Sequence, residues 1–126
     1  NTSTPNKDAI ADYLFNFNTL HDHVDYFVVN VSCPNVTSFT QLQDKDFLVD
    51  LAIKMEEINS NKDKRKPILL KIAPNLNTKK LDEIIELINS SGFDGVVATN
   101  TSTSRDNLNT STEKIKAMES KMLALY

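Results

Sequence analysis

Hydrophobic and polar residues form two different patterns along this chain. In four stretches the apolar residues recur at spacings of three and four, which is typical of one buried helix face. These stretches predict helices over residues 5–20, after Asp46, around residues 81–88, and from residue 110 toward the end. Between them lie short runs that are almost entirely apolar and rich in β-branched residues, the pattern of buried strands. The three runs cover residues 26–31, 68–73 and 95–99.

Local signals set some of the element boundaries. Thr4 followed by Pro5 is a typical helix start, with the threonine as N-cap and the proline at the first helical position. Gly92 is expected to end the third helix, because glycine readily adopts the left-handed conformation found there. Thr110 and Glu113 have the spacing of a capping box, which predicts the start of the last helix.

The order of the elements predicts an α/β fold. Near-continuously apolar strands that alternate with helices indicate a parallel sheet covered by helices. A doubly wound open sheet and a (β/α)₈ TIM barrel both fit this order. The two glycines, Gly92 and Gly95, form no phosphate-binding motif of the kind that open nucleotide-binding sheets carry. A whole barrel needs ~250 residues. We therefore interpret residues 1–126 as a fragment of a single barrel domain, a partial (β/α)₈ TIM barrel of about three βα units.

Composition narrows the classes of function. A formal net charge of −3 argues against a nucleic-acid partner, and no apolar run reaches the ~18 residues of a membrane-spanning helix. The single cysteine, Cys33, fits a reducing compartment. His21 and His23 have no further cysteine or histidine cluster beside them, so we expect a solvated helix end and no metal site. The charged run 62–66 is interpreted as a solvated loop.

Polar residues mark the carboxyl ends of all three predicted strands. Lys71 lies inside an apolar run, where an unpaired ammonium group is costly to bury. An anionic partner or a developing negative charge should face it, unless its side chain extends to solvent. Asn30 is either a core amide or a binding residue, and Cys33 is either a small buried side chain or a reactive thiol. Because strand ends converge at one mouth of a barrel, these residues define a candidate active site.

Three blocks of the sequence resemble the dihydroorotate dehydrogenase family. They are residues 25–35 (DYFVVNVSCPN), 68–76 (ILLKIAPNL) and 94–105 (DGVVATNTSTSR), in the order and spacing of that family's fourth, fifth and sixth barrel strands. The latter two blocks look closest to the quinone-linked, membrane-associated class. The resemblance therefore places the chain in the middle of an FMN-binding TIM barrel, with helices on either side of these strands.

The resemblance implies oxidation of dihydroorotate to orotate in pyrimidine synthesis. FMN would accept the hydride and a quinone would reoxidise the flavin. The full-length protein would be cytoplasmic and peripheral on the inner membrane. Cys33 matches the catalytic base, which removes a proton from the substrate. By the same resemblance Asn30, Lys71 and Thr99 would contact FMN, and Asn30, Asn35, Asn100 and Thr101 would contact the substrate.

Two departures from the family pattern leave alternatives open. The quinone-linked class usually has serine as the base, whereas Cys33 resembles the soluble class. A soluble-class dihydroorotate dehydrogenase, or a barrel like dihydropyrimidine dehydrogenase, therefore remains an alternative. The chain also lacks the family's later glycine-rich segment, whose N–H groups would hold the FMN phosphate. We accordingly predict that the isolated chain binds FMN poorly and is inactive, and an inactive truncated product is the third hypothesis.

Overall fold

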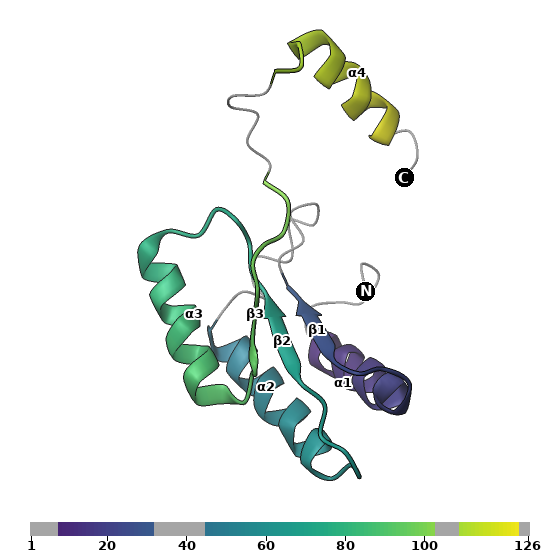
Figure 1. The fold of residues 1–126 in the computed structure, drawn as a ribbon, viewed down its shortest axis with the longest axis vertical. Coiled ribbons are helices and arrows are strands. Elements are labelled where there is room, and N and C mark those ends of the chain that lie inside the picture. Colours follow the sequence, from purple (N-terminus) through teal and green to yellow (C-terminus); the bar gives the residue numbers. More distant parts are fainter. Residues whose placement is uncertain (1–7, 32–44, 103–108, 124–126) are drawn as a thin grey trace.

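The computed structural model describes residues 8–31, 45–102 and 109–123, with side chains up to residue 118 in the last segment. Helices and short parallel strands alternate along the chain (Figure 1). The expected order of elements is thereby confirmed. The elements are α1 (Ala9–Leu20), the 3₁₀ turn η2 (His21–His23), β1 (Phe27–Asn30), α2 (Lys45–Ser60), β2 (Ile68–Lys71), α3 (Thr78–Ser91), β3 (Gly95–Val97) and α4 (Thr112–Leu123).

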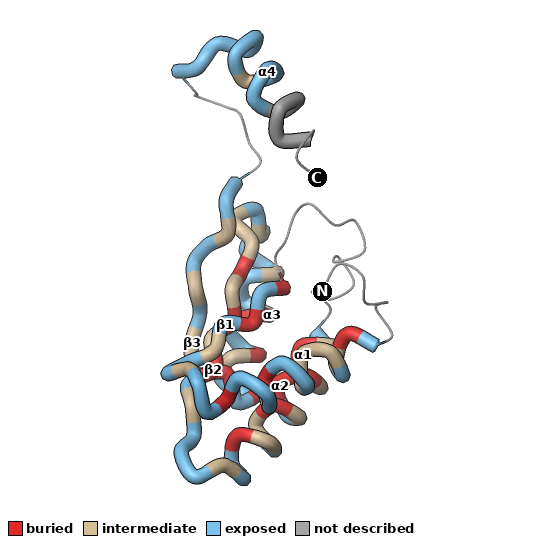
Figure 2. Tube along the Cα trace, turned by 90° about the vertical axis from the view of Figure 1, so that its right-hand side faces the viewer, coloured by how far each residue is buried: buried red, intermediate tan, exposed pale blue. Residues whose placement is uncertain are grey.

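The described strands form one parallel sheet in the order β1-β2-β3. Asn30 pairs in register with Lys71, and Lys71 with Val97, so these three residues form a row across the sheet. Helices α1, α2 and α3 lie on one face of the sheet, whereas no described helix covers the other (Figures 1 and 2). Parallel strands with all crossover helices on one face are the repeating unit of a (β/α)₈ barrel. The structure thus confirms the predicted partial barrel.

The core lies between the sheet and these helices. Side chains alternate across a strand, and Val29 and Leu70 point to the helical side, where they are 3% and 1% exposed. Val28 on the opposite face is 40% exposed. The buried apolar residues are Ala9, Phe17, Val29, Val31, Leu48, Leu51, Ala52, Met55, Ile68, Leu70, Ile72, Ile84, Leu87 and Phe93.

The structure settles two of the predicted helix boundaries. Gly92 has φ of 92° and follows the last residue of α3, as expected for a left-handed helix end. The predicted cap of α4 was wrong by one residue. The hydroxyl of Ser111, not of Thr110, accepts from the backbone N–H of Lys114 at 3.5 Å, and the Ser111 carbonyl accepts the helical bond from Ile115. The predicted start of α1 at residues 4 and 5 lies outside the described residues.

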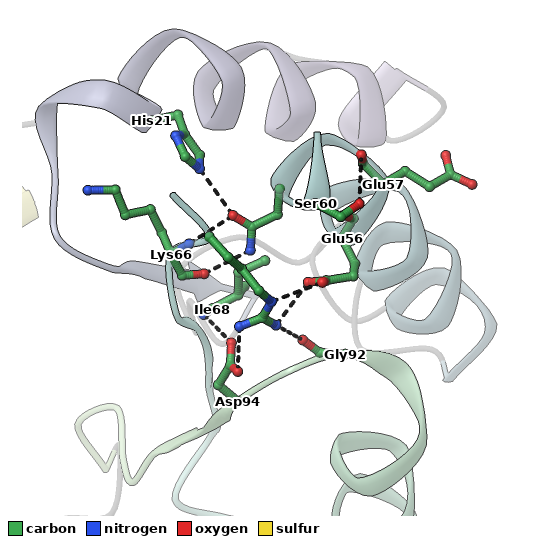
Figure 3. A network of polar contacts seen from close by, with 10 residues as sticks. His21, Glu56, Glu57, Ser60, Lys66, Ile68, Gly92 and Asp94 are labelled. Carbon is green, nitrogen blue, oxygen red and sulfur yellow. Dashed lines mark hydrogen bonds and ion pairs between the residues drawn. The ribbon is translucent and has the colours of Figure 1, made fainter. Parts of the chain in front are cut away.

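His21 corrects the prediction of a solvated helix end. Its side chain is 1% exposed, and its ring packs edge-on against Phe17 with centroids 5.5 Å apart. The Nε2–H group donates to Oδ1 of Asn59 at 3.0 Å (Figure 3). Asn59 is itself fully buried, and it also accepts from the N–H of Lys66 and donates to the carbonyl of the same residue. His21 is therefore a satisfied core residue, whereas His23 is exposed.

Arg65 corrects the interpretation of residues 62–66 as a purely solvated loop. Its Nε and Nη2 atoms donate to the carboxylate of Glu56, both at 2.9 Å, and Nη1 donates to Asp94 at 2.8 Å (Figure 3). The second oxygen of Asp94 accepts from the backbone N–H of Ile68 at 2.7 Å. One guanidinium group therefore joins α2 to the amino-terminal ends of β2 and β3.

Candidate functional site

The carboxyl ends of β1 and β2 bring Asn30 and Lys71 together. The two residues are register partners on adjacent parallel strands. Side chains alternate across a strand, and Asn30 and Lys71 follow the buried Val29 and Leu70, so both project from the face opposite the helices. Asn30 is exposed and Lys71 is half-buried. Within the described part of the chain no carboxylate pairs with the Lys71 ammonium group. The arrangement offers a cation and an amide, side by side, to something bound on the uncovered face.

The loop after β3 lies against the same end of the sheet. Two further backbone bonds extend the sheet past the strands: the N–H of Ile72 donates to Val97 at 3.1 Å, and the N–H of Asn100 donates to Ile72 at 3.0 Å. Asn100 is therefore held next to the residue that follows Lys71. Of the polar residues predicted at the strand ends, Asn30, Lys71 and Asn100 thus lie at the same end of the sheet.

Short-range hydrogen bonds shape the turn that contains the remaining predicted residues. The hydroxyl of Thr99 donates to the carbonyl of Asn100 at 2.8 Å, and the N–H of Thr101 donates to Oδ1 of Asn100 at 3.0 Å. Thr99 and Thr101 are exposed, while Asn100 is half-buried. The two other predicted residues, Cys33 and Asn35, lie outside the described residues, and their roles stay predictions.

One residue at this end of the sheet was missed by sequence reasoning. Tyr13 lies in the stretch 5–20, for which only an apolar helix face was predicted, yet its hydroxyl donates to the carbonyl of Asn30 at 3.0 Å. Burial of the ring, together with the nearby Asp12 carboxylate, raises the pKa of the Tyr13 hydroxyl. The one sequence feature that could have indicated this contact is the tyrosine hydroxyl itself, on a helix face whose other side chains are apolar.

Metal ligands and membrane spans were sought in the described part of the chain. No group of three or more His, Cys, Asp or Glu side chains is placed there to hold a metal ion. None of the helices that the structure describes combines the length and apolar character needed to cross a membrane.

Fold and site together define a sector of a (β/α)₈ barrel whose functional groups gather at the carboxyl ends of its strands. Comparison with known proteins narrows this class. The family model described as dihydroorotate dehydrogenase matches residues 2–121. The chain belongs to the dihydroorotate dehydrogenase family.

Individual relatives agree with this assignment. The chain is 48% identical over 108 residues to a dihydroorotate dehydrogenase (quinone) of Christiangramia forsetii, which covers 86% of this chain and 32% of that protein. It is 46% identical over 107 residues to the protein of the same name from Synechococcus sp., covering 85% of this chain and 27% of the relative. The chain thus spans about a third of the length of the relatives it matches.

Solved structures resemble the chain over most of its length. The crystal structure of ligand-free DHODH from Eimeria tenella superimposes with a TM-score of 0.79 at 25% identity, covering 91% of this chain and 36% of that one. A second structure from Eimeria tenella, DHODH in complex with ferulenol, gives a TM-score of 0.75 at 25% identity and covers 85% of this chain and 32% of that one. The three βα units therefore correspond to part of the barrel of these proteins.

Proposed function

We propose that this chain is a sector of a flavin-dependent dihydroorotate dehydrogenase, which oxidises dihydroorotate to orotate in pyrimidine synthesis. All of residues 1–126 would belong to one barrel domain, from the fourth to the sixth strand with their flanking helices. The observation that carries the proposal is the row formed by Asn30 and Lys71 on the uncovered face, with Asn100 held alongside. Membership of the dihydroorotate dehydrogenase family supports the choice of reaction.

The donors in this row fit an FMN ring. FMN, when bound, supplies the acceptor for the hydride that leaves C6 of dihydroorotate. A flavin that receives a hydride gains negative charge, and the ammonium group of Lys71 would stabilise that charge as it develops. Asn30 would hydrogen-bond both flavin and substrate, because an amide side chain donates and accepts. Thr99 would provide a further contact to FMN.

The remaining residues would bind the substrate and move its proton. Cys33 would act as the base, and its thiolate would take the proton from C5 while the C6 hydride leaves. Asn35, Asn100 and Thr101 would hydrogen-bond the carboxylate and ring amides of dihydroorotate. Oδ1 of Asn100 already accepts from the Thr101 N–H, and this bond restrains the Asn100 side chain.

A quinone would be the physiological electron acceptor. The support is the printed name of the relatives, dihydroorotate dehydrogenase (quinone), at 46–48% identity. The full-length protein would then be peripheral on the cytoplasmic side of the inner membrane. Cys33 supports a second candidate, a soluble-class enzyme that passes electrons to fumarate or NAD, since cysteine is the base of that class.

The test uses the full-length protein that contains this chain. After purification, the bound flavin is released and identified, and dihydroorotate oxidation is assayed with a short-chain quinone, with fumarate and with NAD. We expect FMN and quinone-dependent turnover. Turnover with fumarate or NAD alone would move the protein to the soluble class, and a flavin-free protein that leaves dihydroorotate unchanged would overturn the proposed function. Residues 1–126 alone should show neither flavin colour nor turnover.

A further inference from the structure

The hydrogen bond between Tyr13 and Asn30 links a helix to the candidate site. The two residues are 17 positions apart, and the Tyr13 hydroxyl lies 3.0 Å from the Asn30 carbonyl oxygen. A carbonyl can only accept, so the tyrosine must be the donor. The contact falls on the last residue of β1, which is also the residue whose side chain joins the row with Lys71.

The peptide group after Asn30 is held from two directions. Its oxygen is bound by Tyr13, and the side chain of the next residue, Val31, is 3% exposed within the core. The Asn30 side chain points the other way, because it follows the buried Val29 in the alternation along β1 and is exposed. Holding this peptide group in place therefore restrains the backbone of Asn30, from which its amide side chain extends.

Tyr13 is suited to a fixed rather than an adaptable role. Its ring packs against the core cluster beside Ile10 and Leu14, so the hydroxyl cannot move independently of α1. Because burial raises its pKa, the hydroxyl keeps its proton, and with it the ability to donate, well into the alkaline range.

We propose that Tyr13 is a positioning residue that acts through Asn30: its hydroxyl holds the Asn30 peptide so that the amide side chain meets flavin and substrate together. The inference rests on the proposed function. It predicts that Tyr13 matters while dihydroorotate reduces the flavin, when Asn30 must contact both molecules. Reoxidation of the flavin by quinone does not require that alignment and should be independent of Tyr13.

The experiment measures the two half-reactions separately in the full-length protein by stopped-flow absorbance of the flavin. The variants are Tyr13→Phe and 4-fluorophenylalanine at position 13, which fills the space of the hydroxyl but donates no proton. Loss of one neutral hydrogen bond corresponds to a slowing of about three- to tenfold. We expect both variants to reduce their flavin that much more slowly, with FMN content and quinone reoxidation unchanged. Placing 4-aminophenylalanine there restores a donor and should restore the rate.

Tyr26→Phe is the matched control, since Tyr26 is 57% exposed and lies before the opposite end of β1. Its half-reactions should equal those of the unsubstituted protein. If Tyr13→Phe does not retain FMN, the 4-fluoro variant preserves the packing and decides the question. Flavin reduction at the original rate in the 4-fluoro variant would overturn the inference, as would equal slowing of both half-reactions. An unsubstituted protein that does not oxidise dihydroorotate would instead refute the proposed function.

Discussion

The Nη1 atom of Arg65 lies 2.8 Å from Oδ1 of Asp94, although 29 residues separate them in the sequence. This bond ties the loop before β2 to the residue before β3, and the Ile68 N–H on the other oxygen of Asp94 closes the link to β2. Partial burial alone would raise the pKa of Asp94, but the hydrogen bonds from Arg65 and Ile68 outweigh it. The pKa therefore lies below the usual value for an aspartate.

Asp94→Asn should destabilise the protein, and the effect should depend on pH. Because the folded state lowers the pKa of Asp94, the carboxylate contributes stability above its unfolded pKa of ~3.9 and loses it as pH falls through the lower folded value. We expect a loss of about 1–2 kcal/mol at pH 7, modest because the pair is partly exposed. The difference should shrink below about pH 4. Urea denaturation from pH 3 to 7 measures it, with the exposed Asp63→Asn as control. A constant difference across that range would contradict the prediction.

Asn59→Ala should be more costly. Asn59 is fully buried and its side chain meets His21 and both backbone groups of Lys66. Truncation leaves these groups without partners and opens a cavity, so the free energy of unfolding should fall by about 3 kcal/mol. Asn61→Ala is the control. The exposed amide of Asn61 donates to the Glu57 carbonyl, and its removal should lower the free energy of unfolding by less than about 0.5 kcal/mol. Equal losses in the two variants would show that burial of the network is unimportant.

Gly92→Ala should strain the end of α3. The φ of 92° is unfavourable for a residue with a Cβ atom, whereas the added carbon meets Glu56 only at an ordinary distance of 3.5 Å. The expected loss of about 1–2 kcal/mol is therefore conformational. Gly95→Ala makes the same change where no positive φ is required, with Leu69 at 3.5 Å, and should stay within about 0.5 kcal/mol. Thermal unfolding distinguishes the pair, and a larger loss at Gly95 would refute the argument.

Lys71→Met should leave the fold intact but slow reduction of the flavin. The substitution keeps an unbranched side chain and removes the charge that, in the proposed function, would face the developing anion. Removing one such electrostatic contact typically slows the chemical step by roughly 10²–10³-fold. Lys79→Met, at an exposed position in the first turn of α3, is the control and should reduce flavin at the original rate. A rate within about twofold of the original for Lys71→Met would exclude Lys71 from the role proposed here.

Cys33→Ser should keep activity but move its pH dependence. A thiol ionises with a pKa of ~8.5, far below that of an alcohol, so serine in this place should need more alkaline conditions to accept the proton. The rate of flavin reduction against pH should therefore rise at higher pH in Cys33→Ser. Cys33→Ala should lose about 10²–10⁴-fold at every pH, because it removes the proposed base. An unchanged pH profile in the serine variant would show that another group removes the proton.

The spacing of apolar residues in the sequence reflects which positions are buried, and this spacing therefore predicted most of the fold. The run that contains Val29 is buried on one side, and the spacing around Leu51 defines the face of α2 in the core. The same logic placed Asn30 and Lys71 at the ends of adjacent strands, and parallel pairing then put them in one row. These features depend on positions close together in the sequence or on the general geometry of a parallel sheet.

Polar partnerships distant in sequence could not be predicted in this way. His21 is buried because Asn59, 38 residues later, offers it an acceptor, and nothing near His21 in the sequence indicates this. Arg65 likewise sits in a run of charges that looks solvated until Glu56 and Asp94 are brought beside it. Tyr13 was missed for the same reason, since its partner is a backbone carbonyl, which carries no sequence signal.

The ion pair between Arg65 and Asp94 lies at the amino-terminal ends of β2 and β3. Asn30 and Lys71 lie at the carboxyl ends of β1 and β2. The contacts of Arg65 and Asp94 therefore do not involve the residues of the candidate site. Substitutions in residues 98–102 are expected to leave these contacts in place, so this loop is a suitable target for laboratory evolution. Tyr13 is the exception, because it lies in the helical layer and its hydroxyl donates to the carbonyl of Asn30.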